Sequence, residues 1–215
     1  MASPESAGPL VTVTENGPYR VEGSIPLRDA GGSPIDAQER YFLCRCGHSS
    51  NKPFCDGTHK KVGFSGDESA DHGPIAVRRD SSRGSGITVI DDRTVCSHAG
   101  HCTDGLPSVF KLKTEPWIDP SEADTKALMK VIDSCPSGAL SYTLDGSTEP
   151  VEKERDAEIT PSEDGPYRVT GAVGVVSADG SPYERRARQT LCRCGGSKNK
   201  PFCDGTHWHI GFRAG

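Results

Sequence analysis

The sequence is poor in the residues that build a large hydrophobic core. Only 33% of its 215 residues are hydrophobic and 6% are aromatic, while glycine and proline number 25 and 16. A chain so rich in turn-forming residues buries little apolar surface, so metal centres would be an effective way to stabilise it. No apolar stretch approaches the length of a membrane span, and the first residues form neither a basic nor an apolar region. We therefore expect no membrane segment and a cytoplasmic location.

The sequence also lacks an excess of positive charge, with 25 Lys and Arg against 30 Asp and Glu. The formal net charge is -5 and the pI is about 5.8, which argues against a nucleic acid or an anionic membrane as the partner. The sequence has no phosphate-binding glycine loop and no nucleophile placed beside a base. We therefore expect a protein that is not an enzyme.

What the chain does contain is nine cysteines in three groups of three. The groups are Cys44, Cys46 and Cys55; Cys96, Cys102 and Cys135; and Cys192, Cys194 and Cys203. An odd number cannot be used up by a closed disulfide framework, and disulfides pair cysteines in twos. In a reducing cytosol this pattern indicates metal binding.

The first and third groups belong to a repeated sequence. Sixteen residues that begin at Cys44 recur 148 positions later, beginning at Cys192, with fourteen identities. The similarity extends upstream, because Glu15–Val21 returns as Glu163–Val169 with no insertion or deletion. Each copy is therefore one structural unit.

The repeat divides the chain into a first unit at 10–65, a different module at 74–145 and a second unit at 158–213. The acidic linkers between them, above all Asp145–Asp164, are interpreted as solvated connectors. Short runs of β-prone residues predict strands at Tyr19–Val21, Arg40–Leu43, Arg168–Val169, Gln189–Leu191, Ile87–Ile90 and Leu140–Leu144. Ser121–Asp124 is expected to open a helix. The predicted class is α+β, with two loop-rich β units that could form a pseudo-dimer.

Each repeat holds three cysteines and one histidine in the spacing C-x-C-x8-C-x3-H, a complete set of four metal ligands. Thiolates with one imidazole suit either Zn²⁺ or an iron–sulfur cluster. On a short helix capped by Asp56 and closed by Gly63, Cys55 and His59 would lie one turn apart. The C-x-C pair is tighter than the C-x2-C pair usual in structural zinc sites. Two separate pairs of ligands fit two irons bridged by sulfide, so the spacing favours [2Fe–2S] over zinc.

Both repeats match C-x-C-x2-[S/T]-x3-P-x-C-D-G-[S/A/T]-H, and the chain resembles the CDGSH iron–sulfur domains of the mitoNEET-like family. With the preceding strands the resemblance covers about half of the chain. It implies a redox-active [2Fe–2S] cluster in each unit, with Cys44, Cys46, Cys55 and His59 as ligands in the first and Cys192, Cys194, Cys203 and His207 in the second. Thr58 and Thr206 stand where the family name has serine, a change that keeps the hydroxyl group.

The middle module carries Cys96 and Cys102 in a C-x5-C spacing and then Cys135 before a proline. Over about sixty residues it resembles the divergent single-cluster ferredoxins, which implies a ferredoxin-like α+β fold. Usual ferredoxins have a fourth cysteine where this chain has Ala99, which cannot bind iron. Three thiolates suffice for [3Fe–4S], whereas the fourth iron of [4Fe–4S] would need His98, His101, Asp104 or water. A ferredoxin-like fold without a cluster is the alternative.

These features together predict electron transfer by two [2Fe–2S] clusters and a third [3Fe–4S] or [4Fe–4S] cluster. Cluster storage or transfer, or redox or pH sensing, is an alternative function, and a zinc-binding structural module is another. The expected partner is a redox protein or an apo-protein that accepts a cluster. We expect the chain to be a monomer that contains an internal pseudo-dimer.

Overall fold

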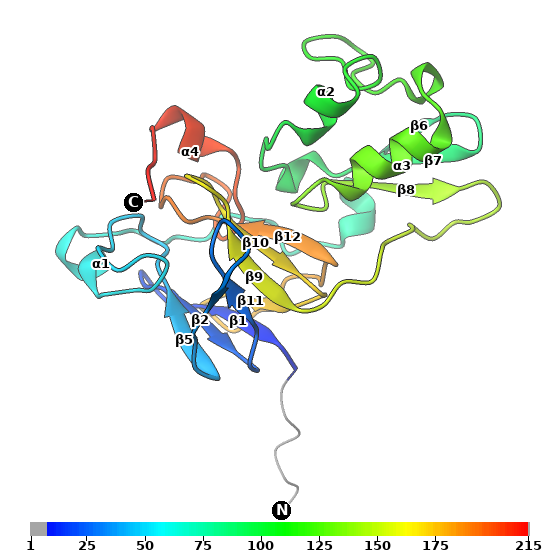
Figure 1. Ribbon diagram of the computed structural model, residues 1–215. Coiled ribbons are helices and arrows are strands. Elements are labelled where there is room, and N and C mark those ends of the chain that lie inside the picture. The colour runs from blue at the N-terminus through cyan, green and yellow to red at the C-terminus, as the bar shows by residue number, and fades with distance from the viewer. Residues whose placement is uncertain (1–7, 215) are drawn as a thin grey trace, which may run out of the picture.

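The computed structural model describes residues 8–214, which form three small sheets and few helices (Figure 1). Their strands are β1 (Leu10–Val13), β2 (Tyr19–Glu22), β3 (Leu27–Arg28), β4 (Pro34–Ile35), β5 (Arg40–Leu43), β6 (Asp80–Arg83), β7 (Ile87–Asp91), β8 (Leu140–Leu144), β9 (Glu158–Pro161), β10 (Tyr167–Thr170), β11 (Gly174–Val176) and β12 (Arg188–Leu191). Their α-helices are α1 (Thr58–Lys61), α2 (His101–Gly105), α3 (Thr125–Asp133) and α4 (Thr206–His209), and short 3-10 helices cover Ile75–Arg78, Arg93–Val95 and Pro120–Glu122. The protein is α+β, as predicted.

The two repeated units exchange strands. In the first unit β1, β2 and β5 form an antiparallel sheet, and β9, β10 and β12 do the same in the second. β11 of the second unit joins the first sheet, parallel to β1 with Gly174 opposite Leu10. β3 of the first unit joins the second sheet, parallel to β9 with Ile159 opposite Leu27. This reciprocal exchange makes the two units one internal pseudo-dimer.

A single hydrophobic core lies between the two sheets of the pseudo-dimer. Alternate residues of β2 and β10 are buried, as expected for strands with one covered face. The rings of Tyr19 and Tyr167 meet edge-to-face with centroids 6.2 Å apart, a favourable geometry for aromatic pairs. Because the units share one core, each buries more apolar surface than it could alone, which offsets the low hydrophobic content.

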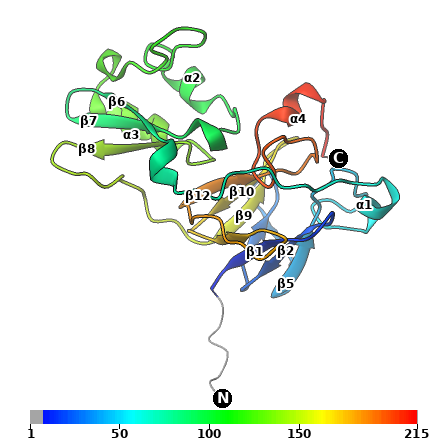
Figure 2. The same ribbon diagram turned by 180° about the vertical axis from the view of Figure 1, so that it is seen from behind.

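The middle module has its own core between the sheet β6–β7–β8 and helix α3. Leu128 and Ile132 of α3 are fully buried there. The helix begins later than predicted, because Asp124 is its cap and accepts the N–H groups of Lys126 and Ala127 at 3.0 Å each. Residues 120–122 form a separate 3-10 turn. Figures 1 and 2 both show this module on the side of α4 and away from α1.

Both linkers make backbone hydrogen bonds to the pseudo-dimer. In the linker after the first unit, the N–H groups of Ser69 and Ala70 donate to the carbonyl oxygen of Lys200 at 2.9 and 3.0 Å. In the other linker, residues 158–161 form β9, a strand inside the second sheet. The interpretation of Asp145–Asp164 as a solvated connector is therefore wrong for that segment, whose strand pairing depends on residues far away in the sequence.

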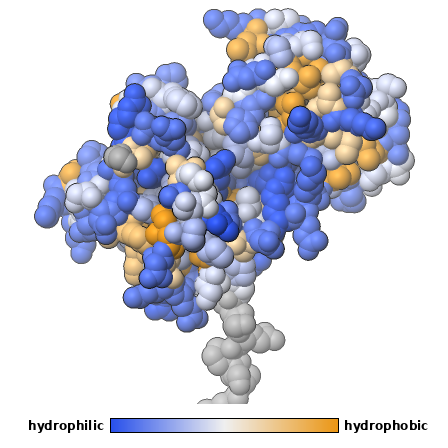
Figure 3. Space-filling model, in the orientation of Figure 1, coloured by the Kyte–Doolittle hydropathy of each residue, from blue (hydrophilic) through white to orange (hydrophobic). Residues whose placement is uncertain are grey.

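Among residues 8–214 there is no helix whose length and hydropathy would let it cross a membrane. In the view of Figure 3, hydrophobic surface is concentrated on the module of α2 and α3, and the pseudo-dimer presents a mostly hydrophilic face.

Candidate metal centres

The four predicted ligands of the first unit lie in two pairs. The sulfurs of Cys44 and Cys46, which directly follow β5, are 3.8 Å apart. The sulfur of Cys55 lies 3.4 Å from Nδ1 of His59 on α1, so Nδ1 is the ring nitrogen that faces the thiol. The pairing arises because the loop folds back after Cys46 and the first turn of α1 places His59 above Cys55.

The second unit repeats this geometry closely. The sulfurs of Cys192 and Cys194 are 3.9 Å apart, and Cys203 lies 3.4 Å from Nδ1 of His207 on α4. Each half-site thus presents either two sulfurs or one sulfur and one ring nitrogen, which are donors suited to iron or zinc.

Asp56 fixes the ligand loop, although not in the cap position predicted for it. The cap residue of α1 is Gly57, at φ 86°, and Asp56 precedes it. The Asp56 carboxylate accepts the N–H groups of Thr58 at 3.0 Å and Ser50 at 2.9 Å. These hydrogen bonds hold the pKa of Asp56 well below its usual range. Gly63, at φ 61°, lies just after the helix in the left-handed conformation predicted for it.

Backbone N–H groups point at the ligand sulfurs. Gly57 donates to Cys55 and Gly205 to Cys203, each at 3.4 Å. Such bonds stabilise negative charge on sulfur and raise the reduction potential of a bound cluster. Burial disfavours the thiolate more than the Gly205 hydrogen bond favours it, and so raises the pKa of Cys203 to about 12. Because metal binds thiolates, loading these sites must release protons.

The two repeated sites differ in exposure. Cys203 and His207 are only 3% and 4% exposed, whereas Cys55 and His59 are half-buried. The middle module covers the second site, where a methyl group added at Gly205 would lie 3.0 Å from Cβ of His98. The equivalent Gly57 of the first site has open space around it. Burial also lowers the pKa of His207 below its usual value.

The three cysteines of the middle module line one cavity of about 230 Å³. His98 and His101 line it as well, but Asp104, another residue considered for a fourth iron, does not. Nδ1 of His101 lies 2.8 Å from the carbonyl oxygen of Ser134. The cavity therefore brings together Cys96, Cys102 and Cys135 with two imidazoles, a donor set that suits an iron–sulfur cluster.

Two buried arginines beside the ligands were missed from the sequence. Arg45 stands between Cys44 and Cys46, and Arg193 between their counterparts. Arg45 is fully buried and donates to the carbonyl oxygens of Gly17 at 2.9 Å and Gly66 at 3.0 Å. Its guanidinium thus joins two separate backbone segments to the loop that carries Cys44 and Cys46, and so positions that loop. The occurrence of arginine between the cysteines of both copies is the signal that could have revealed this role.

Comparison with known proteins agrees with these sites. Residues 16–60 and 164–208 match the family described as iron-binding zinc finger, CDGSH type, and residues 82–145 match the family described as divergent 4Fe-4S mono-cluster. The chain is 48% identical to the uncharacterized protein YjdI of Escherichia coli K12, and to that of strain O157:H7, over 59 residues, which are 27% of this chain and 78% of each relative. The chain therefore belongs to the iron–sulfur proteins of the CDGSH family, with two CDGSH domains flanking a divergent 4Fe-4S mono-cluster domain.

Proposed function

We propose that the protein is an electron carrier, not an enzyme, and that a redox protein is its partner. It binds one [2Fe–2S] cluster in each CDGSH domain, through Cys44, Cys46, Cys55 and His59 and through Cys192, Cys194, Cys203 and His207. A third cluster, [3Fe–4S] or [4Fe–4S], is bound by Cys96, Cys102 and Cys135. When bound, these clusters supply one-electron redox chemistry. The chain provides the cysteine sulfurs, donates backbone N–H groups to those of Cys55 and Cys203, and shields the second CDGSH site from water.

The observation that carries the proposal is the division of each CDGSH ligand set into two pairs. One zinc ion needs four donors around a single point, at about 2.3 Å for sulfur and about 2.0 Å for nitrogen. Within residues 8–214, no three His, Cys, Asp or Glu side chains lie close enough together to hold a single ion. Two donors for each metal instead leave room for bridging sulfides, which supports a two-iron cluster.

A second candidate function, cluster transfer or sensing, is favoured by one observation at the first site. His59 is half-buried, so water and an acceptor protein can reach it. Protonation of a ligating imidazole weakens its bond to iron and would release the cluster. The covered His207 does not favour this function at the second site.

Metal and sulfide analysis of anaerobically purified protein tests the proposal. We expect about seven or eight irons per chain with matching acid-labile sulfide, and EPR signals of more than one cluster type after reduction with dithionite. Colourless protein with stoichiometric zinc and no labile sulfide would reject it. Rapid reduction by a reductase, with slow transfer of iron to an apo-ferredoxin, would favour electron transfer, and the reverse would favour cluster transfer.

A further inference from the structure

The second CDGSH site contacts both of the other cluster sites. On one side, its ligand loop meets that of the first CDGSH domain. A methyl group added at Gly195 would lie 2.7 Å from the carbonyl oxygen of Cys46, and one added at Gly47 would lie 2.7 Å from that of Cys194. Both glycines have positive φ, at 78° and 81°. Only glycine combines this conformation with so close an approach of two backbones.

On its other side, the second CDGSH site meets the central cavity at one imidazole. Gly205 lies against His98, since a methyl group added there would be 3.0 Å from Cβ and 3.1 Å from Cδ2 of His98. His98 also lines the cavity that contains the three central cysteines. The N–H group of Gly205 donates to the sulfur of Cys203 at 3.4 Å. A short path of direct contacts therefore runs from the central cavity through His98 and Gly205 to a CDGSH ligand.

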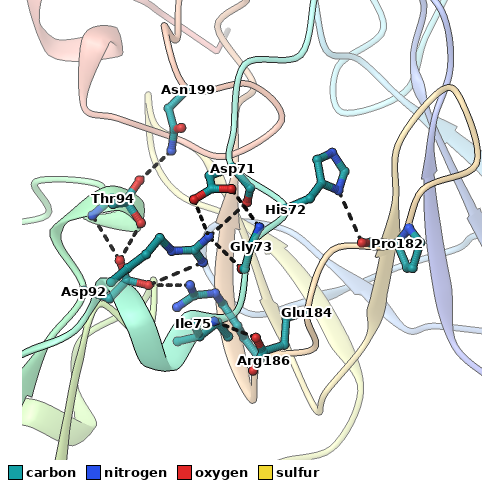
Figure 4. Close-up of polar contacts among 11 residues, drawn as sticks. Asp71, His72, Gly73, Ile75, Asp92, Thr94, Pro182, Glu184, Arg186 and Asn199 are labelled. Atoms are coloured by element: carbon teal, nitrogen blue, oxygen red, sulfur yellow. Dashed lines mark hydrogen bonds and ion pairs between the residues drawn. The ribbon is translucent and has the colours of Figure 1, made fainter.

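A buried ion pair and a hydrogen bond at the surface fix this junction (Figure 4). Asp92, at the end of β7, accepts a hydrogen bond from Arg186 of the second CDGSH domain at 2.5 Å, and both side chains are buried. Nδ2 of Asn199, in the second ligand loop, donates to the carbonyl oxygen of Thr94 at 2.6 Å. Moving the middle module away would separate Asp92 from Arg186 and leave a buried charge without its partner, which is costly. These contacts therefore hold the middle module against the second CDGSH site.

In the first CDGSH domain, the glycine equivalent to Gly205 does not contact the middle module. Gly57, the counterpart of Gly205, has no atom within 4 Å of the position that a Cβ would take. Figures 1 and 2 agree that α4, which carries His207, lies between α1 and the middle module.

We propose that the three cluster sites form a line with the second CDGSH site in the middle, and that His98 and Gly205 are the junction that couples it to the central cluster. This rests on the proposed function, because it requires a cluster in each site. An electron that crosses the junction leaves one centre oxidised and its neighbour reduced by one electron, and no bond forms or breaks. A one-electron donor protein supplies it and a one-electron acceptor protein removes it, and the first CDGSH site, whose Cys55 and His59 are half-buried, is one end of the line.

Magnetic coupling between the clusters tests the order of the sites. EPR power saturation is recorded on full-length, anaerobically purified protein at a potential where the CDGSH clusters are reduced and the central cluster is also paramagnetic. The variants His59→Cys and His207→Cys alter one CDGSH signal each and so identify it. Cys135→Ala then removes the central cluster. We expect the EPR signal of the second CDGSH cluster to lose its relaxation enhancement and the relaxation of the first to change little. Equal changes in relaxation, or a larger change for the first cluster, would overturn the proposed order of the sites.

A matched pair of glycine variants tests the junction itself. Gly205→Ala and Gly57→Ala introduce the same strain, because their φ angles are 83° and 86°, but only Gly205 faces His98. We expect Gly205→Ala to lose the coupling between the central and second clusters and Gly57→Ala to retain it. His98→Ala, which introduces no backbone strain at the ligand loop, should also lose it. Equal effects of the two glycine variants, or full coupling in His98→Ala, would overturn the role of the junction.

The outcomes separate this inference from the proposed function. Wild-type protein without labile sulfide would reject the proposed function itself. Protein that holds all three clusters but shows no coupling between the central and second ones would overturn only the line of sites. If Cys135→Ala leaves the iron content unchanged, the central cavity is empty and the line is overturned as well.

Discussion

The hydroxyl of Tyr19, in the first CDGSH domain, lies 2.9 Å from the carbonyl oxygen of Cys192, a predicted ligand in the second. In the opposite direction, the hydroxyl of Tyr167 in the second domain lies 2.9 Å from the carbonyl oxygen of Cys44 in the first. Both tyrosines are fully buried. Each domain therefore contributes a hydrogen-bond donor that positions the ligand loop of the other, and the two sites are built jointly.

We expect Tyr19→Phe to destabilise the protein and to loosen the cluster of the opposite domain. The change removes a buried hydroxyl that lies within hydrogen-bond distance of two carbonyl oxygens, those of Cys192 and Pro201. A lost buried hydrogen bond costs about 1–2 kcal/mol. Urea unfolding measures the stability, and decay of the visible absorbance measures cluster loss.

Tyr41→Phe is the matched control, because its hydroxyl donates to Ile25 at 2.8 Å within the same domain. It should reduce stability by a similar amount but leave the second cluster as long-lived as in wild type. If both variants shortened the life of the second cluster equally, general destabilisation would explain the effect and the contact between domains would not.

The sequence predicted the ligand pairs because they depend on local spacing within each repeat. The sequence could not predict the exchange of strands. Because β1 and β9 have related sequences, β3 and β11 could each have paired within its own unit or with the other one. It also could not distinguish Gly57 from Gly205, which stand in the same motif. Their difference in burial comes from the middle module, which lies outside the repeat and covers only one site.

We expect Arg188→Met to empty the central site without emptying the CDGSH sites. Arg188, on β12, is 3% exposed and donates to the carbonyl oxygens of Ile132 and Cys135, each at 2.8 Å. Without the guanidinium, these carbonyl groups lose their charged donor and the loop that carries Cys135 is no longer fixed. The destabilisation should be about 2–3 kcal/mol, because buried carbonyl groups lose their donor, whereas Glu152 keeps Arg155 as an ion-pair partner.

The control for this variant is Arg40→Met, the equivalent position of the first domain. Arg40 is exposed and pairs only with Glu22 at the surface, so its loss should cost less than about 1 kcal/mol. Iron and sulfide counts for the two variants measure the effect. Full central iron in Arg188→Met would show that this arginine does not position the Cys135 loop.

Asp91 and Asp92, neighbours at the end of β7, should make the stability of the folded state depend on pH in opposite directions. Burial raises the pKa of Asp91 to about 6, above the usual value of about 3.9. The folded state then binds the proton more tightly than the unfolded state. Protonated Asp91 therefore contributes fully to the stability of the folded state below about pH 4, and this contribution is lost as the pH rises through about 6. Asp91→Asn should therefore be more stable than wild type at pH 7, by at most about 3 kcal/mol.

Asp92 behaves in the opposite way. Burial raises its pKa, but hydrogen bonds from Thr94 and Arg186 outweigh that effect and leave the pKa below its usual value. Its contribution is present above about pH 4 and is lost only as the pH falls further. Asp92→Asn should cost about 3 kcal/mol at pH 7, since Arg186 would stay buried without its partner. Urea unfolding of both variants against wild type at each pH between about 5 and 8 measures these differences; the same sign for both would contradict the assignment.

The difference in burial between the two ligand histidines predicts which cluster is lost first in mild acid. Protonation of a ligating imidazole would weaken its bond to iron, and water reaches His59 because this residue is half-buried. Burial lowers the pKa of His207, so the charged form is disfavoured there and protonation requires a lower pH. Acidification from about pH 7 to 5 should therefore give two phases of absorbance loss, with the first CDGSH site responsible for the faster one.

Replacing each histidine by cysteine assigns the phases. His59→Cys removes the proton-accepting ring and adds an anionic ligand, so the fast phase should disappear and the potential of that cluster should fall. His207→Cys should slow only the second phase. Redox titration and absorbance decay on both variants measure these effects. If His59→Cys lost its cluster as quickly as wild type, His59 would not be the ligand whose protonation opens the first site, and its position 3.4 Å from the Cys55 sulfur would need another explanation.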